Sequence, residues 1–296
     1  DHLILEFGAP FTGEETTGRG LMIQPMQLAF SRGAARQYEK PWRLYVAVYG
    51  VYGENYYNYL SPECIDNVGF FPKGPRTGAS LSFQHRQLFS GYMAGTNLIK
   101  DESERGNATF YTANYDYKNI DKVDSLVKVM RDTPYCLSPA GAIRKELYDN
   151  LVKKHDRGVA YTPVGLVFDR YHGFILTYDR NKVFGALPFT DGDYMMRALT
   201  YALFPWKPEY CPEGQTMVMG SYGDIFDALT NNAGLETMKA YPVLLFVGNV
   251  DLDKLFVGRL IKYVEEGGTL LINAKQIKEG ALPEAFLGCK ISEERG

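Results

Sequence analysis

Short apolar runs alternate with amphipathic stretches along the chain, and each run is long enough for one buried strand. In the segment His2–Pro10 the apolar run ends in Glu6, which predicts a strand with a polar residue at its C-terminal end. Apolar positions at helical spacing over residues 21–39 predict a helix. The next apolar run, Trp42–Tyr49, predicts a second buried strand before a long loop.

The same order of strand and helix then repeats. Residues 80–95 have the spacing of a helix, and Asn97–Glu102 is a short strand that again ends in carboxylates. Ser138 and Pro139 have the N-cap and first-turn signature of a helix that extends to about His155. Strands that are joined through helices must return in the same direction, so the pattern predicts a parallel sheet.

Three such units cannot close a barrel, and three strands alone would leave an exposed sheet edge. We therefore expect the preceding units in an upstream barrel segment or in a second chain. The stretch Asp156–Pro163 has the charge, glycine and proline of a linker. A second α/β unit follows, with strands expected at 164–168, 241–247 and 268–273 and helices at 191–203 and 253–266. The predicted domains are residues 1–158 and 159–296.

Several segments resemble glycoside hydrolases of the family 42 β-galactosidases. Pro163–Gly173, Tyr241–Asn249 and Leu260–Ile272 are similar to their glutamine-amidotransferase-like, flavodoxin-like domain, while Lys40-Pro41 and Phe89–Asn97 look like their last barrel strands. The resemblance implies an α/β fold in which the C-terminal βα units of a (β/α)8 TIM-type barrel precede a flavodoxin-like domain. It also implies that the protein is a glycosidase with a carbohydrate substrate and that the protein forms homo-oligomers.

Two departures from that family limit the resemblance. The family places its nucleophilic glutamate at the end of the strand after the Lys-Pro pair, where this chain has Val46–Tyr49 and no carboxylate before Glu54. A class I glutaminase also needs a nucleophilic cysteine on a sharp turn, and none follows Phe246–Val250. We therefore expect the second domain to lack glutaminase chemistry.

Candidate catalytic residues are acids at predicted strand ends. Glycoside cleavage uses a carboxylic acid and a second carboxylate, and barrel enzymes hold such groups at the C-terminal ends of strands. Glu6 and Glu102 satisfy this rule as catalytic candidates, with Asp101 and Glu104 beside Glu102. In the alternative interpretation, Glu6 caps a loop and the other acids form a solvated turn.

Candidate substrate-binding residues lie in the loops of the first domain. Tyr49, Tyr52 and Glu54 offer rings and hydrogen bonds to a sugar, although a tyrosine-rich loop can equally pack on a neighbouring chain. Arg76 is a candidate partner for a sugar carboxylate. The loop Asp169–Gly173 follows a strand where open α/β sheets bind ligands, but the resemblance implies that it contacts the barrel or a neighbouring subunit instead.

Composition excludes several other classes. The net charge of −3 and a pI near 5.9 leave no basic excess for nucleic acid. The 4 cysteines are scattered without metal-ligand spacing, so we expect no metal and no cofactor. No apolar run approaches the ~20 residues of a membrane span. A periplasmic or secreted location is compatible with these features.

The sequence therefore supports two functions. The first is a glycoside hydrolase that cleaves a poly- or oligosaccharide with two carboxylates, retaining by analogy. The alternative is a non-catalytic carbohydrate-binding or assembly protein with a degenerate barrel, which the missing nucleophile favours. Two carboxyl groups facing one aromatic-lined cleft would indicate the enzyme, whereas scattered exposed acids would indicate the binding protein.

Overall fold

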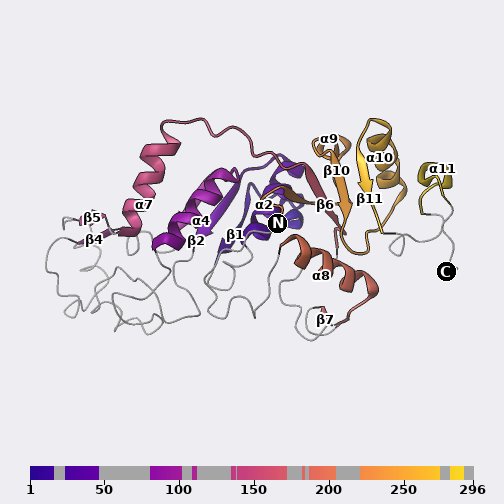
Figure 1. The fold of residues 1–296 in the computed structure, drawn as a ribbon, viewed down its shortest axis with the longest axis horizontal. Coiled ribbons are helices and arrows are strands. Elements are labelled where there is room, and N and C mark those ends of the chain that lie inside the picture. Colours follow the sequence, from indigo (N-terminus) through magenta and orange to yellow (C-terminus); the bar gives the residue numbers. More distant parts are fainter. Residues whose placement is uncertain are drawn as a thin grey trace.

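The structure is a mixed α/β fold that contains two parallel sheets (Figure 1). It is a computed structural model, and it describes residues 1–16, 24–46, 81–101, 109–111, 135–137, 139–171, 182–183, 187–204, 221–273 and 281–289.

The first sheet contains β1 (Thr12–Thr16), β2 (Trp42–Val46) and β3 (Leu98–Asp101) in that order, and both pairings are parallel. Helix α2 (Gln24–Tyr38) lies between β1 and β2 in the chain, and α4 (Leu81–Met93) precedes β3. Helix α7 (Pro139–Leu147) continues into the π-helical turn Tyr148–Val152, named η3. The predictions of parallel βα units and of these three helices are confirmed.

The prediction of a first strand within His2–Pro10 is wrong. Residues His2–Glu6 form helix α1, in which His2 and Leu5 are buried while Leu3 and Ile4 are exposed. Burial at a spacing of three is helical, and a short apolar run alone does not distinguish a buried strand from a helix. The first strand is β1, for which the sequence analysis predicted no strand.

The second sheet contains β6 (Val164–Phe168), β9 (Phe226–Thr230), β10 (Val243–Phe246) and β11 (Thr269–Leu271). Its spatial order is β11-β10-β6-β9, and all its pairings are parallel. In chain order β6 is the first strand of this sheet, and it lies between the second strand, β9, and the third, β10. This is the order of flavodoxin-type sheets. The sequence analysis missed β9. All five of its residues are buried, but Asp227 at its second position interrupts the apolar pattern.

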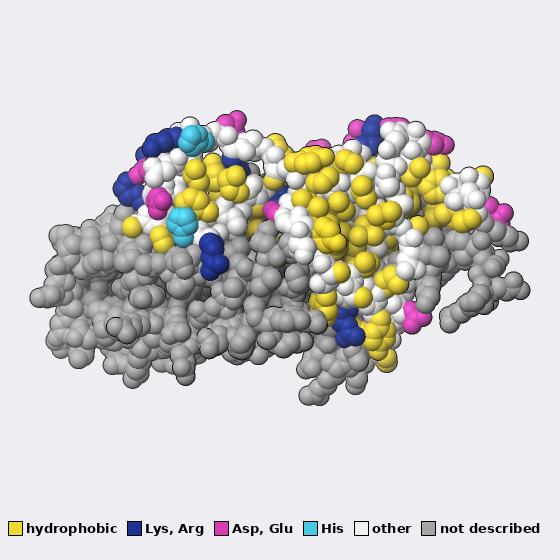
Figure 2. Space-filling view, viewed as in Figure 1, with side chains coloured by type: hydrophobic (Ala, Val, Ile, Leu, Met, Phe, Trp, Pro, Cys, Tyr) yellow, Lys and Arg dark blue, Asp and Glu magenta, His cyan; other side chains and the backbone are white. Residues whose placement is uncertain are grey.

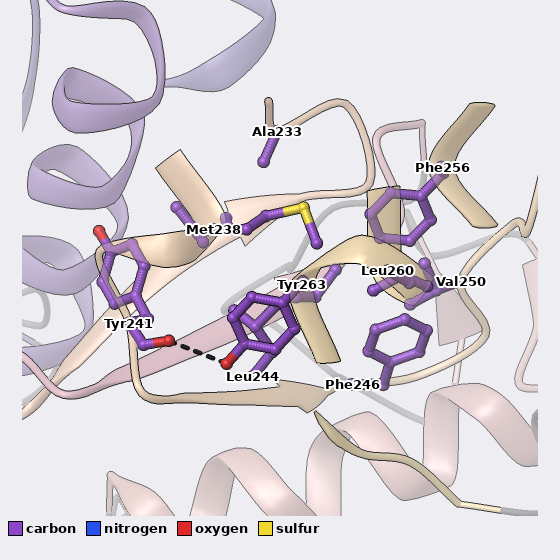
Figure 3. Packing of buried hydrophobic residues seen from close by; sticks show 11 residues of the cluster. Ala233, Met238, Tyr241, Leu244, Phe246, Val250, Phe256, Leu260 and Tyr263 are labelled. Atoms are coloured by element: carbon purple, nitrogen blue, oxygen red, sulfur yellow. Dashed lines mark hydrogen bonds between the residues drawn. The ribbon is translucent and has the colours of Figure 1, made fainter. Parts of the chain in front are cut away.

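Helices cover both faces of this second sheet. On one face, α9 (Leu235–Lys239) and α10 (Lys254–Glu265) enclose a core in which the rings of Phe246 and Phe256 stack (Figure 3). In that core the hydroxyl of Tyr263 donates a hydrogen bond to the carbonyl oxygen of Tyr241 at 2.8 Å. On the other face, side chains of α2 and α8 (Asp191–Leu203) pack with those of β6 and β9.

Helix α2 therefore packs against both sheets, as its central place in Figure 1 shows. Its residues Met26 and Ala29 join the core of the second sheet, whereas Leu28 and Ala35 join the core of the first. The segments 1–158 and 159–296 consequently share a hydrophobic core. Their division into two domains stays a prediction.

The predicted linker, Asp156–Pro163, forms hydrogen bonds with α4 and α2. The guanidinium of Arg157 donates hydrogen bonds to the carbonyl oxygens of Tyr92, Gly95 and Thr96 at the end of α4, at 2.7 to 3.1 Å. Further on, Arg36 of α2 donates hydrogen bonds to Ala160 and Thr162. These bonds hold the connection to the second sheet against both α4 and α2.

The remaining described elements are short: the antiparallel pair β4 (Thr109–Tyr111) and β5 (Tyr135–Leu137), the antiparallel pair β7 (Lys182–Val183) and β8 (Leu187–Pro188), and helix α11 (Glu284–Leu287).

Candidate functional site

The carboxyl edge of the first sheet is the predicted position of the catalytic acids. Register places Thr16, Val46 and Asp101 side by side where β1, β2 and β3 end. Asp101 thus closes its strand as predicted. The other candidates of the first domain that followed these strand ends lie outside the described residues: Tyr49, Tyr52, Glu54, Arg76, Glu102 and Glu104.

The sequence analysis missed Glu14, an acid inside β1. Glu14 lies two residues before the end of the strand, in register with Leu44 of β2, and burial raises the pKa of its carboxyl group. Its register with Leu44, a core residue that packs with α4, places the side chain on the helix-covered face of the sheet. The segment Thr12–Thr16 lacks an apolar pattern, so the sequence offered only its threonines as a strand signal.

Glu6 lies at the opposite end of the first sheet. It precedes the start of β1, and the hydroxyl of Tyr38, which lies just before β2, is 3.4 Å from its Oε2. Its other carboxylate oxygen forms an ion pair with Arg170, which follows β6. The prediction that Glu6 ends a strand is therefore wrong, and Glu102, with which it was expected to share a site, lies outside the described residues. A catalytic role for Glu6 stays a prediction without that support.

The loop Asp169–Gly173, described up to Tyr171, contacts helix α1 through this ion pair. Asp169 accepts hydrogen bonds from the backbone N–H groups of Tyr171 and Asp251, both at 2.9 Å. Asn231 accepts one from the backbone of Arg170, also at 2.9 Å. The contacts of the loop thus tie together the carboxyl ends of β6, β9 and β10.

Two of the helices next to that edge, α8 and α10, have N-termini that are capped by side chains, whereas α9 begins after Gly234 without a side-chain cap. Asp253 accepts hydrogen bonds from Leu255 and Phe256 in α10, both at 2.8 Å, and Thr190 forms a capping box with Asp193 in α8. A capping carboxylate occupies the place where a helix N-terminus would receive an anion. The N-termini of α8 and α10 therefore do not offer the phosphate site that open α/β sheets often have.

The face of the first sheet opposite α4 carries cations and aromatic rings. Trp42, Leu44 and Val46 of β2 pack into the core with α4, so the alternate residues Arg43 and Tyr45 belong to the other face. The guanidinium carbon of Arg43 lies 5.4 Å from the ring centre of Tyr45, and Nζ of Lys100 lies 5.6 Å from it. The alternation of residues within β2 was a signal for this face that the sequence analysis did not use.

A buried ionic network connects α2 with β9. The guanidinium of Arg32 forms ion pairs with Asp227 at 2.6 Å and with Asp224 at 2.8 Å, and Arg36 pairs with Asp227 at 2.5 Å. The Tyr241 hydroxyl donates to Asp227, and burial raises the pKa of that hydroxyl. Each charge in the network has an opposite partner, which indicates a structural role.

The described residues contain neither a metal site nor a membrane-spanning helix. No group of three or more His, Cys, Asp or Glu side chains in the described ranges has the arrangement to hold a metal ion. Among the described helices, none has the length and apolar character that crossing a membrane requires.

No known protein family matches the chain, and no curated protein matches it by sequence. Among solved structures it is similar to Gan42B, a GH42 β-galactosidase, with 11% identity over 88% of this chain and a TM-score of 0.38. A catalytic mutant of the Gan42B from G. stearothermophilus gives 10% identity over 88% of this chain and a TM-score of 0.37. The chain spans about a third of the length of those enzymes, 32% in each case. Likenesses this distant do not establish a family.

Proposed function

We propose that the chain belongs to a glycoside hydrolase that cleaves a poly- or oligosaccharide, with its first sheet forming the last units of a TIM-type barrel and its second sheet a flavodoxin-like domain. The catalytic carboxylates are those that follow β3, with Glu102 as the principal residue. Assembly with an upstream barrel segment or a second chain, and formation of a homo-oligomer, belong to the same proposal.

The position of Asp101 is the observation that carries this proposal. Asp101 ends β3 at the carboxyl edge of a parallel sheet, in register with the end of β2. The acids Glu102 and Glu104 follow it directly in the sequence. Catalytic groups of barrel enzymes come from this edge, because the loops there form the active-site mouth. Glu14 lies near the same edge, but its register with the core residue Leu44 places it on the helix-covered face, away from the proposed site.

A non-catalytic carbohydrate-binding or assembly protein is the second candidate function. The ion pair between Glu6 and Arg170 favours it, because one of the two acids predicted to be catalytic neutralises a cation at the other end of the sheet. In this case the first sheet would hold a sugar without cleaving it.

Product analysis of the native gene product separates the two functions. The protein is incubated with panels of neutral and acidic oligosaccharides, and reducing ends are measured together with binding by calorimetry. Hydrolysis that Glu102→Gln abolishes supports the enzyme. Saturable binding without new reducing ends supports the binding protein, and the absence of both contradicts a carbohydrate function altogether.

A further inference from the structure

The strongest feature that the proposed function leaves unused is a pair of cations without carboxylate partners. Among the described residues, neither Arg43 of β2 nor Lys100 of β3 forms an ion pair. The Nε atom of Arg43 is buried and has no hydrogen-bond partner there. A guanidinium group ordinarily satisfies its donors with carboxylates, carbonyl oxygens or water, so the charge of Arg43 is unmatched among the described residues.

The lysines on α7 and η3, unlike Arg43 and Lys100, have polar or acidic partners on their own helix. Figure 2 shows Lys and Arg side chains gathered over this helical segment. Lys145 and Lys153 both pair with Asp149, and Lys154 donates a hydrogen bond to Asn150 at 3.0 Å. Partners on the same helix already neutralise or satisfy these side chains, whereas Arg43 and Lys100 contact aromatic rings.

The sheet is built to hold Arg43 across its surface. Gly13 of β1 is in register with Arg43, and a Cβ at that position would overlap both the side chain and the carbonyl oxygen of Arg43. The glycine lets the guanidinium extend toward Phe11, whose ring centre lies 5.2 Å from its central carbon. Phe11 is 42% exposed, and Lys100 is exposed beyond Tyr45.

We propose that this face, through Arg43 and Lys100, binds an oligosaccharide that carries carboxylate groups, such as one containing uronic acid residues. The inference rests on the proposed carbohydrate function and names its substrate class. The charges are complementary, since a planar guanidinium pairs with a carboxylate through two parallel hydrogen bonds and an ammonium adds a second contact. The exposed ring of Phe11 offers an apolar surface for the sugar ring.

In a closed barrel this face, opposite the covering helices, is the one that lines the interior. Tyr45 and Lys100 are in register one residue before the end of their strands, so a ligand held there lies near the carboxyl edge of the sheet. The two cations would thus position an acidic sugar beside the proposed catalytic edge.

Calorimetric titration of the full chain tests this inference. The ligands are a tetrasaccharide of uronic acid residues, a neutral tetrasaccharide of matched linkage, and inorganic polyphosphate. The proteins are the unmodified chain, Arg43→Gln, Lys100→Met and, as a matched control, Lys254→Met at an exposed position of α10. Circular dichroism verifies the fold of each variant, and Lys100→Met keeps the test valid if Arg43→Gln does not fold.

We expect the uronic acid ligand to bind at least about tenfold more tightly than the neutral one, and each cation variant to lose about tenfold while Lys254→Met binds normally. Equal affinity for both sugars, or unchanged affinity in Lys100→Met, overturns the inference and leaves the carbohydrate function standing. Equally tight binding of polyphosphate also overturns it, because the face would then accept any polyanion. Failure of all sugars to bind overturns it as well, and the separate hydrolysis measurement then decides the proposed function.

Discussion

Arg32 of α2 and Asp227 of β9 lie 195 residues apart in the sequence, yet Nε of the arginine is 2.6 Å from Oδ1 of the aspartate. Their side chains are 2% and 0% exposed. Burial alone would lower the pKa of Arg32, but the hydrogen bonds and charges of Asp224 and Asp227 raise it overall, so the guanidinium keeps its charge in the core. The pair joins two parallel sheets that the sequence assigned to separate domains.

Removing the positive charge should therefore destabilise both sheets together. We expect Arg32→Met to lower the free energy of unfolding by about 3–5 kcal/mol, because it removes one of the two cations that pair with the buried carboxylate of Asp227. Urea unfolding followed by fluorescence and by circular dichroism measures the effect. The exposed residue Lys262 gives the control, since Lys262→Met should change stability by no more than about 0.5 kcal/mol. An equally small effect in Arg32→Met would show that the network contributes little.

Close packing of α2 on β9 gives a second prediction. A Cβ at Gly33 would overlap the carbonyl oxygen of Ala228, whereas a Cβ at Gly258 in α10 meets no atom within 4 Å. Gly258→Ala should stabilise the protein by about 0.5–1 kcal/mol through helix propensity. Gly33→Ala brings the same gain in helix propensity, but it should destabilise the protein by about 1–3 kcal/mol, because α2 must move away from β9 to make room for the methyl group. The midpoints of thermal unfolding would contradict this account if both variants moved in the same direction.

Buried His2 gives a prediction on pH. Burial lowers the pKa of His2 to about 3, so the ring is neutral in the folded protein and Nε2 lies 3.0 Å from the carbonyl oxygen of Ala228. The unfolded chain takes up the proton near pH 6.5 and the folded chain does not. The stabilisation is therefore complete above pH 6.5 and is lost as the pH falls toward 3, by up to about 1.4 kcal/mol per pH unit.

The matched variant for this prediction is His2→Gln, which keeps an amide donor but does not titrate. As the pH falls from about 6.5 to 4.5, the free energy of unfolding, measured with urea, should decrease more for the unmodified chain than for the variant. Parallel pH profiles for the two proteins would mean that His2 is accessible to protons in the native state.

The contact between Glu6 and Arg170 gives a fourth prediction. Both side chains are partly exposed, at 19% and 29%, so solvent screens the ion pair. Glu6→Gln and Arg170→Met should each cost no more than about 1 kcal/mol, and the double variant should cost less than the sum of the two. If Glu6→Gln left the fold intact but abolished turnover, Glu6 would regain its predicted catalytic role.

The sequence was sufficient to predict the elements with a clear period. Helices α2, α8 and α10 and strands β2, β6 and β10 lie where apolar spacing placed them. It did not predict β1, because Thr12–Thr16 contains no apolar residue, and it did not predict β9, because Asp227 interrupts the apolar pattern there. The acids in these two strands have partners or surroundings that only the tertiary structure supplies: Asp227 pairs with arginines of α2, and Glu14 lies half-buried in an edge strand.

The same limit applies to the candidate site. Sequence placed Asp101 correctly at a strand end, because the apolar pair Leu98 and Ile99 begins that strand. It misplaced Glu6, because a short apolar run fits a strand or a helix equally well and only packing against α2 decided between them. The proximity of Arg43 to Phe11 depends on the register of β1 with β2, which no local pattern specifies.

The turnover of Glu102→Gln in the native gene product tests the proposed function most directly. An amide keeps the size of the side chain but cannot act as a nucleophile or donate the titrating proton, so we expect turnover of a glycoside to fall at least about a hundredfold with the fold intact. Glu146, an exposed acid on α7, provides the matched control, and Glu146→Gln should retain full turnover. Unchanged turnover in Glu102→Gln, with stability altered by no more than about 0.5 kcal/mol, would contradict the catalytic assignment and favour the binding protein.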